Sequence, residues 1–359
     1  MNIYCIRPKG LNIGNEAIFL AMKHFIHRAF GQVPNIITLP STSVFESHRT
    51  AGLTSRTIHE INHYADGVIV GGGNLYENNN LDLDPLALAA LEVPLFLFAL
   101  SYGRVYNRFG QLVRRTDAMP DDRIRALNQK AQLSHVRDMA TYSHLQSIGV
   151  TNVVCSGCPT LFLDKLDVDL NQFREVPEGL TLISVRHPAL MSIPVHKQAQ
   201  VYRDVQGIIS WLLSLGHDVR ILCHDYRDIP FACTFPEVDY IYTDDVYVYL
   251  ALLQRCRLNV TYRLHSALPC LAFQKPFIQI SYDERALSLV ETIGYSDWNI
   301  NMIHCSDVLA EVMNRYKRLH ELEHLRERIA VRRDELYKLM LAGFERFAEY
   351  TEAFRRRNR

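Results

Sequence analysis

The sequence predicts an α/β protein made of two doubly wound domains that face each other across a cleft. Short apolar runs of strand length alternate with helix-period segments throughout, which is typical of parallel sheets with crossover helices. The 359 residues are enough for two such domains of ordinary size. A polar stretch at 164–179, which ends in Pro177-Glu178-Gly179, separates the two series and is expected to be the interdomain linker.

The first predicted domain, residues 1–165, begins with a strand at 2–7, a glycine-bearing turn at 10–16 and a helix at 17–30. The polar stretch at 107–122 is expected to be an exposed loop. The remaining elements expected in this domain are strands at 35–39, 66–70, 94–100, 133–136 and 153–154 and helices at 121–132 and 139–148.

Three of these strands end in small or charged side chains. Gly71-Gly72-Gly73-Asn74 follows 66–70, and three glycines there indicate either backbone that touches a ligand or a flexible turn. Ser101-Tyr102-Gly103-Arg104 follows 94–100. Arg137-Asp138 follows 133–136, where the plain alternative is that Asp138 caps a helix and Arg137 pairs locally.

The second predicted domain, residues 180–305, repeats the same alternation. Its strand at 180–185 ends in Arg186-His187, and its strand at 218–223 ends in His224-Asp225. A charged helical segment follows at 306–359. The other elements expected are strands at 258–260 and 277–280 and helices at 198–215, 245–256, 264–273 and 284–293.

Arg263 and His265 lie where the strand at 258–260 passes into a helix. Ligands of open α/β sheets bind beyond the carboxyl ends of strands, and a helix amino terminus favours anions. An arginine can fork onto a carboxylate or phosphate, and a histidine can move a proton near neutral pH. The pair therefore suggests an anionic substrate. The alternative is that Arg263 pairs with a buried acid and His265 only caps the helix.

Composition excludes several classes of protein. The 39 Lys and Arg balance the 39 Asp and Glu, so no overall field favours nucleic acid as a partner. No apolar run reaches the ~20 residues of a membrane span, and no signal peptide precedes the first strand, so we expect a cytoplasmic protein. The basic end, Phe354–Arg359, predicts at most peripheral contact with the inner face of a membrane, or a solvated helix end. Among eight cysteines only Cys155 and Cys158 are close in sequence, so no metal is expected.

The chain resembles the polysaccharide pyruvyl transferases. The resemblance covers most of the sequence and depends on the order and spacing of its motifs, which are GLNIGNEAI at 10–18, DGVIVGGGN at 66–74, VRDMATYS at 136–143, GCPTLFL at 157–163, and RLHS, KP and YD within 262–283. It implies two Rossmann-like domains of the GT-B type, with the helices of 306–359 packing back on the first domain. It also implies transfer of the enolpyruvyl unit of phosphoenolpyruvate, as a cyclic ketal, onto a sugar of a cell-surface or exported polysaccharide such as an exopolysaccharide, without a cofactor.

By the same resemblance Arg263, Leu264 and His265 form the donor-binding element, and Arg137 is the second donor contact. Two departures concern the acceptor and the chemistry. Asn15 stands where the family commonly has aspartate, and Arg285 stands where a lysine usually follows the YD element. Arginine keeps the charge but not the compact ammonium geometry.

The sequence contains the types of residue that such a donor requires. Phosphoenolpyruvate carries a phosphate and a carboxylate, so at least two cations should converge, and Arg137, Arg186 and Arg263 can supply them. His265 is the predicted proton donor, with Asp138 or Glu16 as the base. The glycine-rich strand ends suit hydroxyl groups, and the predicted acceptor-binding residues are Asn15, Gly72, Gly73, Asn74, Ser101 and Tyr102.

Two alternatives remain open at the level of sequence. A GT-B glycosyltransferase that uses a nucleotide sugar would share the two-domain layout and the basic cleft. A sugar- or phosphate-binding protein that has lost catalysis is the other, because fold does not dictate function. The predicted partners are phosphoenolpyruvate and a sugar acceptor that a lipid carrier could present, with homo-oligomerisation left open.

Overall fold

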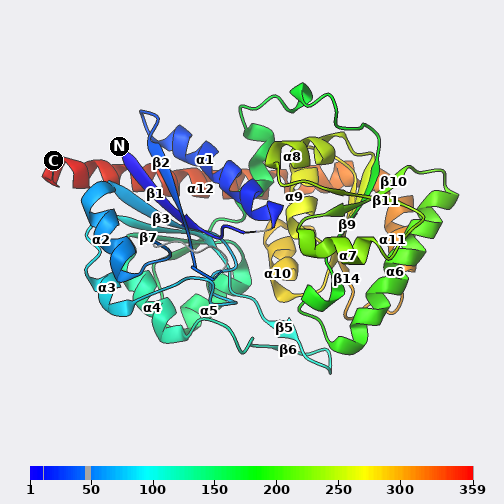
Figure 1. Ribbon diagram of the computed structural model, residues 1–359, viewed down its shortest axis with the longest axis horizontal. Helices are drawn as coiled ribbons and strands as arrows, with labels where there is room; N and C mark the ends of the chain where they lie inside the picture. Colours follow the sequence, from blue (N-terminus) through cyan, green and yellow to red (C-terminus); the bar gives the residue numbers. More distant parts are fainter. Residues whose placement is uncertain (11, 45–49, 359) are drawn as a thin grey trace.

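The computed structural model of the chain describes residues 1–10, 12–44 and 50–358. Two six-stranded sheets form its two halves (Figure 1), and neighbouring strands within each sheet run parallel. The first sheet has the order β2 (Asn35–Pro40), β1 (Asn2–Arg7), β3 (Gly67–Gly73), β4 (Leu95–Leu100), β7 (Leu133–Val136), β8 (Val153–Cys155). The second has the order β11 (Asp239–Tyr242), β10 (Val219–Cys223), β9 (Thr181–Val185), β12 (Leu258–Thr261), β13 (Phe277–Ser281), β14 (Ile300–Asn301).

Helices connect successive strands, as the parallel order requires. They are α1 (Ile13–Ala29), α2 (Ser55–Tyr64), α3 (Pro85–Ala89), α4 (Asp121–Lys130), α5 (Met139–Ser147), α6 (Val195–Ser214), α7 (Ile229–Ala232), α8 (Val246–Arg255), α9 (Leu264–Ala272), α10 (Glu284–Ile293), α11 (Val308–Lys317) and α12 (Leu322–Asn358). The predicted fold class, two doubly wound α/β units, is therefore confirmed. None of the helices in the described part of the chain is long and apolar enough to cross a membrane.

Several predicted elements need correction. Helix α1 begins at Ile13 rather than Ala17, because the Asn12 side chain caps it by accepting the Gly14 N–H at 3.0 Å. Asn15 and Glu16 are consequently helical residues and not part of a turn. The predicted loop at 107–122 contains most of a short antiparallel hairpin, β5 (Val105–Tyr106) with β6 (Leu112–Val113). Helix α2 and the edge strands β11 and β14 were not predicted.

The long helix α12 runs back from the second half of the molecule to the first, and both chain termini lie on that side (Figure 1). Its Phe344 ring packs against Phe98 at 4.6 Å and Phe96 at 5.2 Å between ring centroids. Phe344 also stacks on Phe25 of α1 at 5.7 Å. These fully buried rings join α12 to the first sheet and to α1, so the C-terminal helix is part of the N-terminal core.

Gly343 of α12 lies where the helix comes closest to the first sheet. A Cβ atom built there would lie 2.4 Å from Cε1 of the buried His135 ring. We expect Gly343→Ala to lower the free energy of unfolding by about 1–3 kcal/mol, because overpacking a close contact outweighs the better helix propensity of alanine. Thermal or denaturant unfolding measures this change.

Gly31→Ala is the matched control, because a Cβ atom at Gly31 meets nothing within 4 Å. If the two variants unfold alike, the close approach of α12 to His135 does not limit what position 343 accepts.

Candidate functional site

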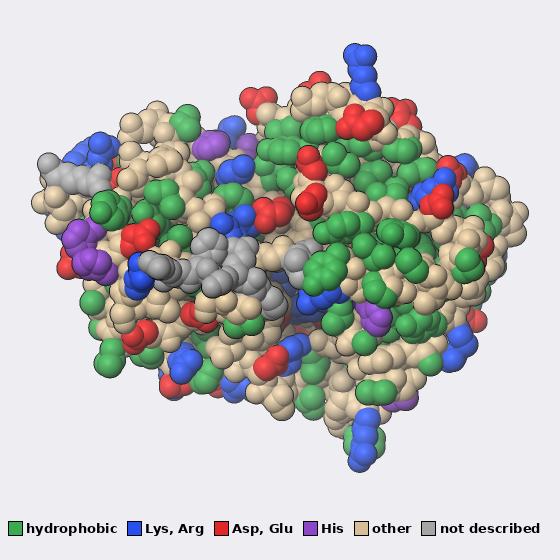
Figure 2. Space-filling view, viewed as in Figure 1, with side chains coloured by type: hydrophobic (Ala, Val, Ile, Leu, Met, Phe, Trp, Pro, Cys, Tyr) green, Lys and Arg blue, Asp and Glu red, His purple; other side chains and the backbone are tan. Residues whose placement is uncertain are grey.

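A cavity of about 280 Å³ lies between the two sheets at the carboxyl ends of their strands. Figure 2 shows Lys or Arg side chains in a hollow near the middle of the molecule. The cavity is lined by Asn12, Asn15, Gly73, Asn74, Asn78, Arg115, Arg137, Arg186, Leu190, Ser192, His224, Tyr262, Arg263, Leu264, His265, Tyr282, Asp283, Arg285 and Ala286.

Strand ends supply this lining because all strands of a parallel sheet end at one edge. Arg137 follows β7, Arg186 follows β9, and Arg263 follows β12. The strand order reverses between β1 and β3 in the first sheet and between β9 and β12 in the second. Ligands of doubly wound folds bind at such switch points. Here the two switch points face one cavity.

Besides Arg115, which pairs with Asp117 at 2.7 Å, two of the lining arginines pair with carboxylates of the protein. Arg186 Nη1 lies 3.2 Å from Asp225 Oδ2 and 3.5 Å from Asp228 Oδ1. Arg285 donates from Nη1 to Glu77 Oε1 at 2.9 Å, and from Nε to Asp283 Oδ2 at 2.9 Å. Both arginines therefore have partners before any ligand binds.

Arg263 and Arg137 have no carboxylate of the described residues as close as those that pair with Arg186 and Arg285. No carboxylate in the described part of the chain lies within 4.0 Å of the Arg263 guanidinium, although Arg263 is only 7% exposed. Arg137 is 3% exposed and lies 3.8 Å from Asp138 at Nε, which makes no hydrogen bond. A buried guanidinium without a close carboxylate is costly unless an anion joins it. The alternative, in which Arg263 pairs with a buried acid, has no support among the described residues.

His265 lies near the charges of Arg137, Arg263 and Arg285 and close to α1 of the first domain. It is in the first turn of α9, and Gly14 of α1 leaves room for it, because a Cβ atom at Gly14 would lie 2.9 Å from His265 Cβ. The buried His265 Nε2 atom has no hydrogen-bond partner in the described structure. Burial lowers the pKa of His265 well below its ordinary value, and so do the charges of three neighbours, Arg137, Arg263 and Arg285. These effects favour the neutral form of the imidazole at pH 7 in the absence of an added anion.

Side-chain amides line the wall opposite the arginines of the second domain. Asn12 and Asn15 come from the start of α1, and Asn74 and Asn78 come from the chain that follows β3. The Asn78 Oδ1 atom is buried without a hydrogen-bond partner. Amides both donate and accept hydrogen bonds, as a ligand with hydroxyl groups requires.

The two predicted bases, Asp138 and Glu16, do not line the cavity. Asp138 is fully buried and caps α5 by accepting the Thr141 N–H at 2.9 Å. Glu16 accepts two hydrogen bonds from Arg7, at 2.7 and 2.9 Å. The ion pair engages both oxygens of Glu16, whereas the cap engages only Oδ1 of Asp138, and the buried Oδ2 has no hydrogen-bond partner among the described residues.

Three of the predicted acceptor residues also lie outside the lining. Gly72 has φ of +81°, and a Cβ atom there would lie 2.7 Å from Ile18 Cγ2, so the backbone itself requires glycine. Ser101 is fully buried behind the cavity wall. Tyr102 stacks on His144 with ring centroids 3.7 Å apart. Asn15, Gly73 and Asn74 are the predicted acceptor residues that do line the cavity.

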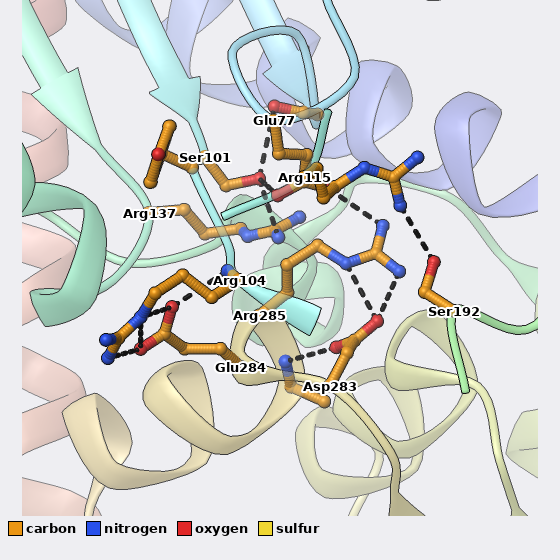
Figure 3. A network of polar contacts seen from close by, with 12 residues as sticks. Glu77, Ser101, Arg104, Arg115, Arg137, Ser192, Asp283, Glu284 and Arg285 are labelled. Carbon is orange, nitrogen blue, oxygen red and sulfur yellow. Dashed lines mark hydrogen bonds and ion pairs between the residues drawn. The ribbon is translucent and has the colours of Figure 1, made fainter. Parts of the chain in front are cut away.

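Sequence reasoning missed several lining residues. Arg115 reaches the cavity from the polar loop and donates to Ser192 Oγ, in the other half of the molecule, at 2.8 Å (Figure 3). Nothing in the sequence marked it, because a loop gives no periodic signal. His224 was recognised at the end of its strand but was not assigned to the site, and Tyr262, which also follows a strand, could have been identified by the same rule.

The described residues contain no cluster of three or more His, Cys, Asp or Glu side chains that could hold a metal ion. All eight cysteines are free, and five of them are buried. Chemically, the cavity offers guanidinium groups without a close carboxylate, a row of amides, and two imidazole nitrogens, His265 Nε2 and His224 Nδ1, that have no hydrogen-bond partner in the described part of the chain. It suits a small anion with a polyhydroxyl compound beside it.

Comparisons with known proteins agree with this architecture. The family model for polysaccharide pyruvyl transferases matches residues 12–284, which is more than half of the chain. The UDP-GlcNAc 2-epimerase of Methanocaldococcus jannaschii, solved with UDP-GlcNAc and UDP, is similar in structure, with a TM-score of 0.54, 12% identity and coverage of 89% of this chain and 92% of that one. The UDP-GlcNAc 2-epimerase of Neisseria meningitidis, bound to UDP-GlcNAc, gives a TM-score of 0.51, 10% identity and coverage of 89% and 100%.

At these identities the structural likeness shows the fold alone, which is a two-domain α/β fold of the GT-B type. No curated protein matches the chain by sequence.

Proposed function

The chain belongs to the polysaccharide pyruvyl transferase family, and from that membership we propose that it transfers the enolpyruvyl unit of phosphoenolpyruvate onto a sugar of a cell-surface or exported polysaccharide as a cyclic ketal. The observation that carries the donor assignment is the state of the two arginines Arg137 and Arg263. They line one cavity with His265, and neither has a carboxylate as close as those that neutralise Arg186 and Arg285.

Phosphoenolpyruvate has two anionic groups on a three-carbon frame. Arg263 and Arg137 would each hold one of them through charge-assisted hydrogen bonds. The charge of the bound donor would offset the arginine charges that lower the pKa of His265. The imidazole would therefore gain a proton when the donor binds, and it would be protonated when the reaction needs an acid.

The proposed reaction needs one proton delivered and two removed. His265 would give its proton to the methylene carbon, which becomes the methyl group of the ketal. One sugar hydroxyl attacks the adjacent carbon and loses its proton, a second hydroxyl does the same, and phosphate leaves with the electron pair of its C–O bond. Arg137 and Arg263 would also stabilise the charge that develops on the departing phosphate.

The acceptor would occupy the first-domain side of the cavity. Asn12, Asn15, Asn74 and Asn78 can donate to and accept from sugar hydroxyls there, and Gly73 lets the backbone approach the sugar closely. Asn15 cannot act as a base, so the hydroxyl proton would go to another acceptor, such as the departing phosphate.

Thermal stabilisation by phosphoenolpyruvate tests the donor assignment. A ligand present at a hundred times its dissociation constant adds ~2.7 kcal/mol to the free energy of unfolding. We expect phosphoenolpyruvate to raise the melting temperature of the wild-type protein, and an equal concentration of pyruvate, which lacks the phosphate, to do so far less.

UDP-GlcNAc is the comparison ligand, because the structurally similar epimerases were solved with it. Stabilisation by UDP-GlcNAc in place of phosphoenolpyruvate would replace the proposal with a nucleotide-sugar enzyme. Stabilisation by phosphoenolpyruvate without release of phosphate in the presence of sugar acceptors would indicate a binding protein.

A further inference from the structure

A buried carboxylate behind the cavity, Glu77, connects two of its arginines. Glu77 lies on the chain between β3 and α3, and its side chain is 1% exposed. Its Oε1 accepts from Arg285 Nη1 at 2.9 Å, and its Oε2 accepts from the Ser101 hydroxyl at 3.3 Å. Ser101 Oγ in turn accepts from Arg137 Nη2 at 2.9 Å. Figure 3 shows this chain of contacts.

These contacts run from one half of the molecule to the other. Ser101, Arg137 and Glu77 belong to the first half, and Arg285 starts α10 of the second. Arg285 also binds Asp283, which caps α10 by accepting the Ala286 N–H at 3.1 Å. The Arg285 guanidinium thus donates hydrogen bonds both to the carboxylate that caps its own helix and to a carboxylate of the opposite half. A planar group with several donors is suited to this arrangement.

Gly103 makes room for the contact. A Cβ atom at Gly103 would lie 2.4 Å from Arg285 Cγ and 3.2 Å from Glu77 Oε2. The glycine after β4 is therefore explained by the passage of Arg285 toward Glu77.

We propose that Glu77 is a positioning residue of the site, which sets the place of the Arg137 guanidinium through Ser101 and that of Arg285 directly, and so fixes the donor pocket across the two halves of the molecule. Glu77 does not line the cavity, so it acts through the arginines and not on the substrate. This inference depends on the proposed function, because it takes phosphoenolpyruvate as the donor.

The proposal and a simple field effect predict opposite changes in donor affinity when the charge of Glu77 is removed. If Glu77 acted only through its charge, removing that charge would make the pocket more positive and would tighten binding of an anion. If Glu77 positions the guanidiniums, removing its charge weakens binding, because misplacement by about 1 Å can cost up to ~100-fold. The direction of the change therefore separates the two roles.

The experiment measures phosphoenolpyruvate binding by titration calorimetry for the wild type and for Glu77→Gln. We expect Glu77→Gln to raise the dissociation constant about tenfold at pH 8, while turnover at saturating donor falls much less. Ser101→Ala should also weaken binding, because it breaks the link to Arg137 and leaves the pair of Glu77 with Arg285 intact.

Glu284→Gln is the matched control. Glu284 is also buried and also joins the two halves, since it accepts from Arg104 Nε at 3.0 Å, but neither residue lines the cavity. This variant should lose stability without a change in the donor dissociation constant. Equal effects of Glu77→Gln and Glu284→Gln on donor binding would show that Glu77 is one structural contact among others.

A pH series gives an independent readout. Burial raises the pKa of Glu77 to about 7, although Arg285 and Arg137 lower it, and the other charged group that faces it, Asp283, raises it. The wild type should therefore lose donor affinity as pH falls through 7 and Glu77 gains a proton. The affinity ratio of wild type to Glu77→Gln should then fall toward one below pH 7, and the titration of the donor cancels in that ratio.

Three results would overturn the inference. Donor binding that tightens in Glu77→Gln would leave only the field effect, and donor binding that stays unchanged would remove Glu77 from the site. Absence of phosphoenolpyruvate binding to the folded wild type would overturn the proposed function and this inference with it. Donor binding to the wild type separates the first two results from the third.

Discussion

Replacing His265 by asparagine should reduce turnover by ~100-fold or more, while the dissociation constant of phosphoenolpyruvate changes much less. Asparagine keeps the approximate size of the side chain and a hydrogen-bond donor, but it cannot deliver a proton. A proton donor acts as charge develops on the alkene carbon, so its loss affects the transition state more than the ground state. Steady-state release of phosphate, measured with saturating donor, gives the turnover, and calorimetry gives the donor affinity.

The direction in which turnover should change with pH follows from the pKa of His265. Burial and the charges of three arginines lower the pKa of His265, so we expect proton uptake when the donor binds. Turnover should then decline at high pH as the imidazole of the complex loses that proton. In His265→Asn this basic limb should disappear, and proton uptake on donor binding should fall. If His265→Asn binds the donor much more weakly but keeps its turnover at saturation, His265 is a phosphate ligand, and His224 of the cavity wall is the next candidate acid.

Replacing Arg263 by alanine should weaken phosphoenolpyruvate binding by about 1.5–3 kcal/mol, which is roughly 10- to 150-fold. In the proposed site Arg263 would contact an anion that is present in both ground and transition states, so the loss should be mainly in donor affinity. The free energy of unfolding should not fall, because the variant removes a buried charge that no described carboxylate within 4.0 Å neutralises. Calorimetry and thermal unfolding test the two expectations separately.

The same variant should shift the pH profile. Because Arg263 lowers the pKa of His265, its removal should move the basic limb of turnover to higher pH. Arg346→Ala is the control, since Arg346 is an exposed arginine of α12 that pairs with Glu349 at 2.7 Å, far from the cavity lining in sequence. A large loss of stability in Arg263→Ala, with unchanged donor affinity, would assign Arg263 to the fold and not to the site.

The strand ends show how much of the site the sequence could predict. Arg137, Arg186 and Arg263 were identified because each follows a strand, and parallel strands end at a common edge. The same rule predicted Ser101 and Tyr102 as site residues, but neither of them lines the cavity. Ser101 turns into the protein to bind Arg137, and Tyr102 stacks on His144, because a residue after a strand can face either side of the sheet edge.

The two candidate bases, Asp138 and Glu16, lie outside the cavity lining for a related reason. A carboxylate at a helix start can face a ligand or cap its own helix, and Asp138 caps α5. Sequence position is the same in both cases. Only the direction of the side chain decides between them, and that depends on packing against α10, where Ser288 Oγ accepts the Ala140 N–H at 2.8 Å.

Local periodicity and the common direction of parallel strands made the fold class and the position of the candidate site predictable from the sequence. The tertiary structure alone decided which arginines are available to a ligand. Glu77 and Arg285 are 208 positions apart in sequence, yet their ion pair neutralises one cavity arginine, whereas no carboxylate of the described residues pairs with Arg263. Electrostatic pairing depends on distance in space, so no local pattern in the chain can specify it.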